Sequence, residues 1–215
     1  GLAEKEIRDV LRTLGRSDGN GQRKFLAKNF RGEQNIPDLF LVVAYGKIIP
    51  EDILNIPKFG SVNIHYSLLP KYRGASPVES AILKGNTETG VTIQKMEYKM
   101  DSGPILTQEK VKIFPDEKTL ELRKRLIKIG GELFKKILPD FLEGKIKPKR
   151  QNENEATYCM KIKKEDGLLD LNADEIINYN KFRAYSFWPR IFFFQNNKRI
   201  IITDAELTKN QFVIK

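Results

Sequence analysis

The longest uninterrupted apolar run, Leu39–Ala44, constrains the fold more than any other part of the sequence. A continuous apolar stretch that continues to Tyr45 and ends at Gly46 is typical of a strand buried on both faces of a sheet. The run is far shorter than the roughly 18 residues that a membrane-spanning helix needs. We therefore expect a central strand at Leu39–Tyr45, in a mostly parallel sheet of a protein that does not enter a membrane.

Further apolar segments alternate with helical patterns along the chain. Short strands are predicted at Ser61–His65, Val91–Met96 and Ile105–Ile113. A capping box with proline at the first helical position, Ser76-Pro77-Val78-Glu79, predicts a helix that ends at Gly85. An apolar stripe from Leu122 to Phe141 predicts a long helix between Asp116 and Gly144. This alternation indicates an α/β domain with flanking helices on a mostly parallel sheet.

The pattern divides the chain into three parts. The α/β domain is expected over residues 1–144, and it begins with a helical pattern at 2–14. The glycine-rich and basic segment Gly15–Lys24 that follows is either a mobile substrate loop or a linker. Residues 145–190 are expected to form a basic linker with a short helix near Asp174–Tyr185. Residues 191–215 are expected to form a β-hairpin that turns at Asn196-Asn197.

Charge and composition narrow the function classes. The chain has 38 Lys+Arg against 28 Asp+Glu, a formal net charge of +10, and this excess favours polyanions such as nucleic acid or a phosphorylated small molecule. Solvated helix and loop faces explain the basic residues equally well, because no aromatic residue is interleaved with them. The single Cys159 and the single His65 exclude an internal disulfide and a Cys/His zinc site, so no metal is expected. The start carries no apolar signal segment, which favours a soluble, intracellular protein.

The only histidine lies in the predicted strand Ser61–His65. On an extended strand, Asn63 and His65 point to the same face, at the strand end where open α/β sheets bind their ligands. Asp101 lies in a tight loop after the next predicted strand and reaches His65 if the two strands are neighbours. An isolated histidine is more often a satisfied core residue, and a turn aspartate often caps its own backbone. The position of Asn63 and His65 together at the end of a strand favours a functional interpretation of the histidine.

An amide, an imidazole and a carboxylate that converge suit acyl transfer without a covalent enzyme intermediate. The amide of Asn63 and a protonated His65 can hold a developing oxyanion, while Asp101 keeps the ring charged and helps to move the proton off the attacking amine. Ser67 nearby suggests a Ser/His/Asp hydrolase instead. That alternative is disfavoured because the G-x-S-x-G elbow is missing and Ser67 is followed by the rigid segment Leu68-Leu69-Pro70.

Several motifs at fixed spacing resemble the formyltransferases that use 10-formyltetrahydrofolate. The motifs are Asn63-Ile64-His65-Tyr66-Ser67-Leu68-Leu69-Pro70, Tyr72-Arg73-Gly74-Ala75-Ser76-Pro77, and Gly90-Val91-Thr92-Ile93 running to Asp101-Ser102-Gly103-Pro104-Ile105-Leu106. The Arg73–Pro77 extension, with Ala156-Thr157-Tyr158 and Trp188-Pro189, resembles the methionyl-tRNA formyltransferase family in particular. The resemblance covers about residues 36–203.

The resemblance implies a Rossmann-like catalytic domain and a set of site residues. It assigns catalysis to Asn63, His65 and Asp101. It assigns the folate to the backbone after the central strand, at Tyr45, Gly46, Lys47, Ile48 and Ile49, and also to Ser67, Leu68, Leu69 and Pro70. It places the tRNA substrate against Arg73 and Gly74 and, by a poorer match of the basic loop, against Arg16, Arg23 and Lys24.

The resemblance also implies an activity, a formyl donor and partners. The expected product is N-formylmethionyl-tRNA, made with 10-formyltetrahydrofolate as donor and methionyl initiator tRNA as acceptor, by a cytoplasmic monomer. We expect the first βαβ unit to be incomplete, because the family opens with a strand and a glycine turn where residues 1–35 show a helix and a loop. Residues 191–215 are expected to be the first strands of the family's C-terminal barrel.

Two other functions stay open at this point. The same chemistry can serve an amino sugar nucleotide or another small amine. An inactive RNA-binding remnant, held to its partner by the net charge of +10, belongs to a different class. The dependence of binding on salt concentration distinguishes a tRNA acceptor from a small-molecule acceptor, since binding through phosphates weakens steeply with ionic strength.

Overall fold

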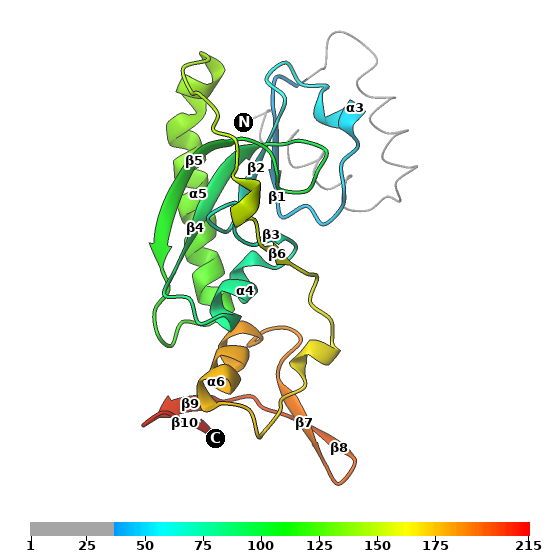
Figure 1. Ribbon diagram of the computed structural model, residues 1–215, viewed down its shortest axis with the longest axis vertical. Helices are drawn as coiled ribbons and strands as arrows, with labels where there is room; N and C mark the ends of the chain where they lie inside the picture. Colours follow the sequence, from blue (N-terminus) through cyan, green and yellow to red (C-terminus); the bar gives the residue numbers. More distant parts are fainter. Residues whose placement is uncertain (1–36) are drawn as a thin grey trace, which may run out of the picture.

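The computed structural model describes residues 37–215, which centre on a four-stranded sheet with the order β1-β2-β4-β5 (Figure 1). Its strands are β1 (Phe40–Val43), β2 (Ser61–His65), β4 (Glu88–Lys95) and β5 (Ile105–Lys112). β1 and β2 pair in parallel, whereas β2 with β4 and β4 with β5 pair antiparallel. The α/β class is confirmed. The described sheet is mixed rather than mostly parallel, because β4 and β5 form a hairpin, and the alternation of elements along a sequence does not reveal strand direction.

The strand from the apolar run lies at one edge of the described sheet. In the part of the chain that the structure describes, β1 pairs with β2 alone, and Val43 is 38% exposed. Full burial on both faces is not found for this strand, whereas its central position in the sheet stays a prediction, because the described residues do not include the segment before it. The predicted helix at 2–14 and the predicted basic loop at Gly15–Lys24 lie outside the described residues.

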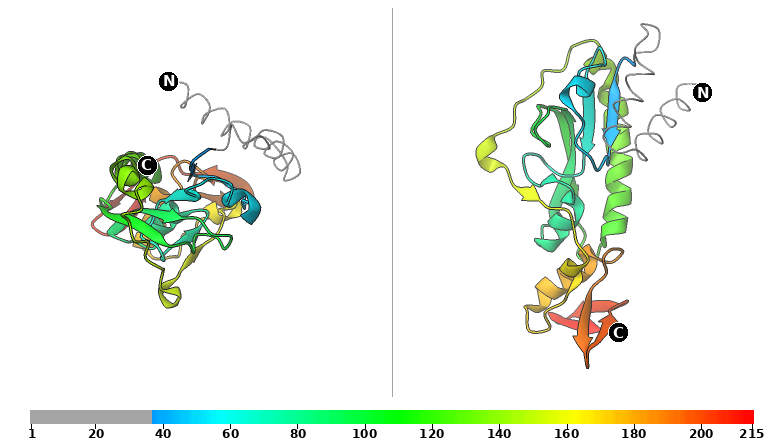
Figure 2. Two further views of the ribbon diagram at one scale, coloured as in Figure 1. Left: turned by 90° about the horizontal axis from the view of Figure 1, so that it is seen from above. Right: turned by 90° about the vertical axis from the view of Figure 1, so that its right-hand side faces the viewer.

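The long helix α5 (Thr119–Leu142) covers one face of the sheet, as Figure 2 shows. It approaches closely at Gly130, where a Cβ atom would lie 2.8 Å from Cγ2 of Ile64 and 3.3 Å from Cγ1 of Val91. Because side chains alternate along a strand, the apolar residues of β2 and β4 that face α5 form the core. The prediction of a long amphipathic helix in this region is confirmed.

The opposite face of the sheet is polar although it is buried. Register places Asn63 opposite Gln94, His65 opposite Thr92, and Thr92 opposite Gln108. His65, Thr92 and Gln94 are at most 6% exposed. A sheet with one apolar face and one buried polar face has a hydrogen-bonded site on the second, because buried polar groups need partners.

Short elements connect the strands of the sheet. They are α3 (Glu51–Leu54), β3 (Arg73–Gly74), α4 (Pro77–Leu83), the 3-10 turn η1 (Glu153–Glu155) and β6 (Tyr158–Cys159), which pairs in parallel with β3. Among them, β3 and the segment with η1 contact the loop that carries Asp101 on this polar face. Helix α4 begins at the predicted proline, but Ser76 does not cap it: its hydroxyl donates to the carbonyl of Met160 at 2.5 Å. Glu79 pairs instead with Arg123 of α5. The proposed linker thus contains a strand and returns to the α/β domain.

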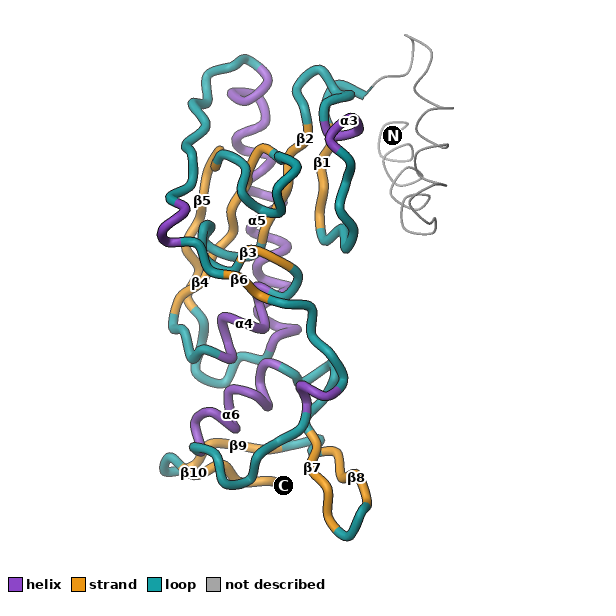
Figure 3. The backbone as a smooth tube through the Cα atoms, turned by 45° about the vertical axis from the view of Figure 1, so that its right-hand side comes forward, coloured by secondary structure: helices purple, strands orange, loops and turns teal. Residues whose placement is uncertain are grey.

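The C-terminal part packs at one end of the α/β domain (Figure 3). Its elements are the 3-10 turn η2 (Glu165–Gly167), α6 (Glu175–Ala184), β7 (Phe192–Gln195), β8 (Lys198–Ile201), β9 (Ala205–Thr208) and β10 (Gln211–Ile214). Asp174 caps α6 by accepting from the amides of Ile176 and Ile177. Asn196 and Asn197 both have positive φ, as a two-residue hairpin turn requires. The predicted helix and hairpin are confirmed.

Hydrogen bonds and aromatic packing join α6 to its surroundings. The hydroxyl of Thr119 donates to the carbonyl of Ala184 at 2.6 Å, and the hydroxyl of Tyr179 donates to Asp116 at 2.9 Å. Burial, with the nearby carboxylate, raises the pKa of Tyr179 to about 12, so this phenol stays a donor. Tyr179 and Phe182 also pack with Phe212 of β10. Within residues 37–215, none of the helices combines the length and the apolar character needed to cross a membrane.

Candidate active site

The three residues predicted to carry chemistry meet on the polar face of the sheet. Asn63 and His65 project from β2, and Asp101 comes from the loop between β4 and β5. Nδ1 of His65 lies 3.7 Å from Oδ2 of Asp101, and Nδ2 of Asn63 lies 3.4 Å from Oδ1 of the same carboxylate. The predicted convergence is confirmed, because β2 and β4 are neighbours.

Asp101 reaches the site by a route that the sequence does not indicate. Since β4 runs antiparallel to β2, the loop after it does not start at the strand end that carries His65, and it folds back over the sheet face instead. Gly103 lies against this strand, where a Cβ atom would stand 1.8 Å from the carbonyl oxygen of Lys95. Asp101 itself has a φ of 51°, a left-handed conformation that non-glycine residues rarely adopt.

The ring of His65 lies between two oxygen acceptors. Nε2 is 2.8 Å from the carbonyl oxygen of Tyr72, so this nitrogen carries a hydrogen and donates it. Nδ1 faces the Asp101 carboxylate on the other side. The ring thus donates through Nε2 to Tyr72 and presents Nδ1 to the carboxylate of Asp101.

Three donors fix the carboxylate of Asp101. The backbone amide of Gly74 donates to Oδ2 at 2.8 Å, and Gln94 Nε2 donates to Oδ1 at 3.1 Å, beside the longer contact from Asn63. Gly74 has a φ of 117°, and a Cβ atom there would lie 2.2 Å from the carbonyl oxygen of Cys159. Only glycine fits at this position, so the predicted substrate residue Gly74 has a clear role in orienting Asp101.

Gln94 is a site residue that sequence reasoning missed. It interrupts the apolar pattern of β4, is 2% exposed and stands opposite Asn63. A polar residue inside a predicted buried strand was the available signal, because a buried amide needs partners. The pairing register needed to assign it to the site comes only from the structure.

The segment Ser67–Pro70, predicted to bind folate, is fixed beneath the site by hydrogen bonds. Thr92 donates its hydroxyl to the carbonyl of Ser67 at 2.6 Å and accepts from the amide of Leu69 at 3.1 Å. Ser67 and Leu69 are at most 3% exposed, whereas Leu68 and Pro70 are partly exposed. Burial leaves Leu68 and Pro70 as the members of this segment that can face a ligand.

The hydroxyl of Ser67 is also not a nucleophile activated by histidine. It donates to the carbonyl of Lys71 at 2.6 Å, and both nitrogens of His65 face other groups. A nucleophilic serine needs a base within hydrogen-bond reach. This geometry agrees with the rejection of a Ser/His/Asp hydrolase.

The second predicted folate segment, Tyr45–Ile49, follows β1 directly. Ile48 is 63% exposed, and Gly46 and Lys47 are exposed beside it. A Cβ atom at Gly46 would find no atom within 4 Å. The segment thus presents an apolar side chain and uncovered backbone, and its role in folate binding stays a prediction.

The expected contact of Arg73 with a substrate does not fit the structure. Its side chain is 0% exposed, and its guanidinium donates to Gln151 and to both carboxylate oxygens of Glu153, at 3.0 and 2.6 Å. The Arg73 guanidinium, with Lys99, lowers the pKa of Glu153 to about 2. Sequence alone does not separate a buried structural arginine from an exposed one. Arg16, Arg23 and Lys24, the other predicted tRNA contacts, lie outside the described residues.

Comparison with known proteins gives consistent family matches. The Formyl transferase model matches residues 21–138, and the model of the Formyl transferase C-terminal domain matches residues 161–213. Proteins called methionyl-tRNA formyltransferase from Caldicellulosiruptor saccharolyticus and Dictyoglomus turgidum are 39% and 42% identical over 173 and 176 residues, 80% and 82% of this chain. The matched regions cover only 55% and 56% of the two relatives' own sequences, so this chain spans about half the length of the relatives that it matches.

Solved structures show the same fold. An N-formyltransferase from Helicobacter canadensis, in complex with folinic acid and dTDP-3-aminofucose, superposes with a TM-score of 0.68 at 24% identity. The match covers 85% of this chain and 66% of that one. A 4-N formyltransferase from Francisella tularensis gives a TM-score of 0.71 at 21% identity, over 93% and 92% of the two chains.

Proposed function

This chain belongs to the formyl transferase family, and from that membership we propose that it transfers the formyl group of 10-formyltetrahydrofolate to the α-amine of methionyl-tRNA. The observation that carries the proposal is the convergence of Asn63 and His65 with Asp101 on one sheet face. The relatives that are about 40% identical, all called methionyl-tRNA formyltransferase, support the choice of acceptor.

The proposed mechanism uses the donors and the acceptor of this face. The amide of Asn63 donates to the oxygen on which negative charge develops during acyl transfer. The Nε2–H of a His65 imidazolium, which donates to the Tyr72 carbonyl in this structure, donates to the same oxygen when substrate is bound. Asp101 stabilises the charge on the ring and keeps Nδ1 directed toward itself. The amine loses one proton as its nitrogen forms the bond to the formyl carbon, and the Asp101 carboxylate lies beside the two donors to accept that proton. The bond between the formyl carbon and the folate nitrogen would break in the same transfer, and that nitrogen would take up one proton.

The described surface fits a folate donor. Val43 and Ile48 are 38% and 63% exposed on either side of Gly46, where the backbone is uncovered. Exposed apolar side chains next to free space and peptide groups suit a flat ring with a hydrogen-bonding edge. We propose that Tyr45–Ile49, with Leu68 and Pro70, hold 10-formyltetrahydrofolate, which supplies the formyl group when bound.

The charge of the chain suits a tRNA acceptor. The net charge is +10, and the segment after α5 carries exposed basic residues: Lys145, Lys147, Lys149 and Arg150. Phosphate contacts of this kind supply most of the affinity for nucleic acid and make it depend on salt. We propose that methionyl initiator tRNA is the physiological acceptor.

Acceptor competition tests the proposal. The rate of formyl transfer from 10-formyltetrahydrofolate is measured with methionyl initiator tRNA and with dTDP-3-aminofucose, at 50 and 200 mM salt. We expect transfer to the tRNA, with a rate constant kcat/KM that falls steeply with salt. If formyl transfer occurred only to the amino sugar nucleotide and depended little on salt, an amino sugar and not methionyl-tRNA would be the acceptor. If the folded chain bound tRNA but bound no folate and transferred no formyl group, the chain would be an RNA-binding protein and not a formyltransferase.

A further inference from the structure

Gln151, in the segment between α5 and β6, makes every hydrogen bond that its side-chain amide allows. Its oxygen accepts from Nε and Nη2 of Arg73, at 3.1 and 2.8 Å. Its nitrogen donates to the carbonyl oxygens of Asp101 and Gly103, at 2.8 and 2.7 Å, and lies 3.3 Å from the side-chain oxygen of Gln94. An amide has two N–H donors and two acceptor lone pairs, so this one is saturated.

Arg73 fixes the orientation of that amide. A guanidinium donates but never accepts, so the oxygen of Gln151 must face Arg73 and the nitrogen must face the loop. Arg73 is itself held in place by two hydrogen bonds to Glu153. The buried arginine therefore determines which end of Gln151 meets the loop that carries Asp101.

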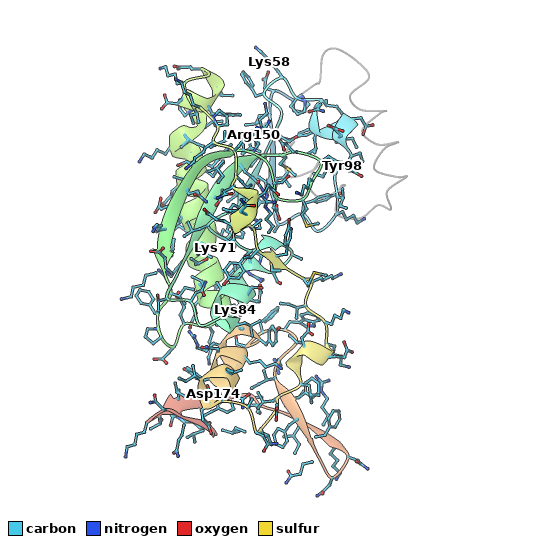
Figure 4. All side chains as sticks on the ribbon, in the orientation of Figure 1. Lys58, Lys71, Lys84, Tyr98, Arg150 and Asp174 are labelled. Carbon is cyan, nitrogen blue, oxygen red and sulfur yellow. The ribbon has the colours of Figure 1, made fainter. Side chains whose placement is uncertain are left out.

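The same short segment holds the loop at additional points. Lys99 donates to Glu153 at 2.9 Å, and the guanidinium of Arg150 lies 3.8 Å from the carboxylate of Glu97. Figure 4 shows Arg150 on the chain that passes this loop, on which Tyr98 is labelled. Among the side chains of this segment, all within the described residues, Gln151 is the one that donates to the backbone carbonyl of Asp101.

We propose that Gln151 is a positioning residue that sets the place of Asp101 relative to His65, and through it the rate of the proposed formyl transfer. Asp101 has a left-handed backbone, which is unfavourable for a residue with a side chain and persists only where its surroundings hold it. The hydrogen bond to its carbonyl oxygen supplies that hold. The expected effect on the rate rests on the proposed function, whereas the positioning of Asp101 by Gln151 does not depend on it.

Two substitutions separate positioning from simple packing. Gln151→Glu keeps the size of the side chain and an oxygen that binds Arg73, but it places a second oxygen against the carbonyls of Asp101 and Gly103. Gln151→Met keeps the length and removes the hydrogen bonds without adding charge. Asn154→Asp is the matched control, because it adds a negative charge to the same exposed segment away from the loop.

Kinetics give the first readout. We expect both Gln151 variants to lose about 100-fold in kcat with little change in the KM for 10-formyltetrahydrofolate, because displacement of a catalytic group by about 1 Å has this effect. Asn154→Asp should keep the kcat of the original chain. Unchanged kcat in both Gln151 variants would overturn the inference.

The second readout does not depend on activity. His65 is the only histidine, so its ring gives one set of nuclear magnetic resonance signals. At a fixed pH these signals should move in Gln151→Met and Gln151→Glu and stay in place in Asn154→Asp. Signals that stay in place in both Gln151 variants would contradict positioning even if no transfer is seen. If the original chain transferred no formyl group but the His65 signals still moved in the Gln151 variants, the proposed function would be wrong and the positioning of Asp101 by Gln151 would stand.

Discussion

Nδ1 of His65 lies 3.7 Å from Oδ2 of Asp101, although strand β2 carries the histidine and a loop beyond the next strand of the sheet carries the aspartate. The other ring nitrogen is occupied by the carbonyl of Tyr72 at 2.8 Å. The ring thus lies between two oxygen acceptors, one hydrogen-bonded to Nε2 and the other facing Nδ1. This preorganisation is the basis of the proposed catalysis.

Replacement of the aspartate should remove catalysis while the fold stays intact. We expect Asp101→Asn to lower kcat by at least about 100-fold, because a neutral amide neither stabilises the charged ring of His65 nor accepts a proton. Asp140→Asn, at an exposed position of α5, is the matched control and should keep its activity. Steady-state transfer kinetics measure the kcat of both variants, and a kcat of Asp101→Asn within a few-fold of that of the original chain would remove Asp101 from the mechanism.

Two adjacent glycines of α5 should respond in opposite directions. A methyl group at Gly130 meets Ile64 at 2.8 Å, so Gly130→Ala overpacks the core and should lower the free energy of unfolding by about 1–3 kcal/mol. At Gly131 nothing lies within 4 Å, so Gly131→Ala should raise it by roughly 0.5–1 kcal/mol through helix propensity. Urea unfolding compares the two, and equal effects would contradict the close approach of α5 to the sheet.

Acid should weaken the contact between Arg73 and Glu153. The pKa of Glu153 is lowered to about 2 from 4.5, so the ionised carboxylate stabilises the folded state above about pH 4.5, and this stabilisation is lost as the pH falls through about 2. Glu153→Gln should therefore reduce the loss of Tm between these pH values. The control is Glu155→Gln, whose carboxylate receives a hydrogen bond from Asn152 rather than from a guanidinium. Parallel Tm curves for Glu153→Gln and the original chain would show that the ion pair adds nothing.

Thr92 should matter for folate binding without touching the folate. Its hydroxyl joins Ser67, Leu69 and the side chain of Gln108, so Thr92→Val leaves buried groups without a partner and should cost about 1–3 kcal/mol of stability. We also expect a higher KM for 10-formyltetrahydrofolate, because Leu68 and Pro70 lose their support. Thr107→Val, at a partly exposed position on β5, is the control. Equal stability and equal KM in the two variants would contradict the role of Thr92.

Sequence patterns that span only a few neighbouring residues predicted a long helix and a hairpin turn correctly. The stripe from Leu122 to Phe141 predicted α5, and Asn196-Asn197 predicted the β7–β8 turn, because helical periodicity and left-handed turn residues act within a few positions of the chain. The pair Asn63 and His65 was predicted to share a face for the same reason. These parts of the fold and of the site needed no knowledge of distant residues.

Features that depend on distant partners could not be predicted in this way. Ser76 and Glu79 form a capping box in the sequence, yet Met160 and Arg123 bind them instead. Arg73 was expected at the substrate, yet Gln151 and Glu153 surround it. In each case the partner lies far along the chain, and the pairing of β3 with β6 or the packing of α5 brings it close.

The most direct test of the account is the transfer of a labelled formyl group from 10-formyltetrahydrofolate to methionyl initiator tRNA by the original chain and by His65→Ala, both shown to be folded by circular dichroism. We predict labelled N-formylmethionyl-tRNA from the original chain and at least a 100-fold lower rate from the variant, on the order expected for loss of an oxyanion donor. Equal rates from the two proteins would contradict the proposed role of His65.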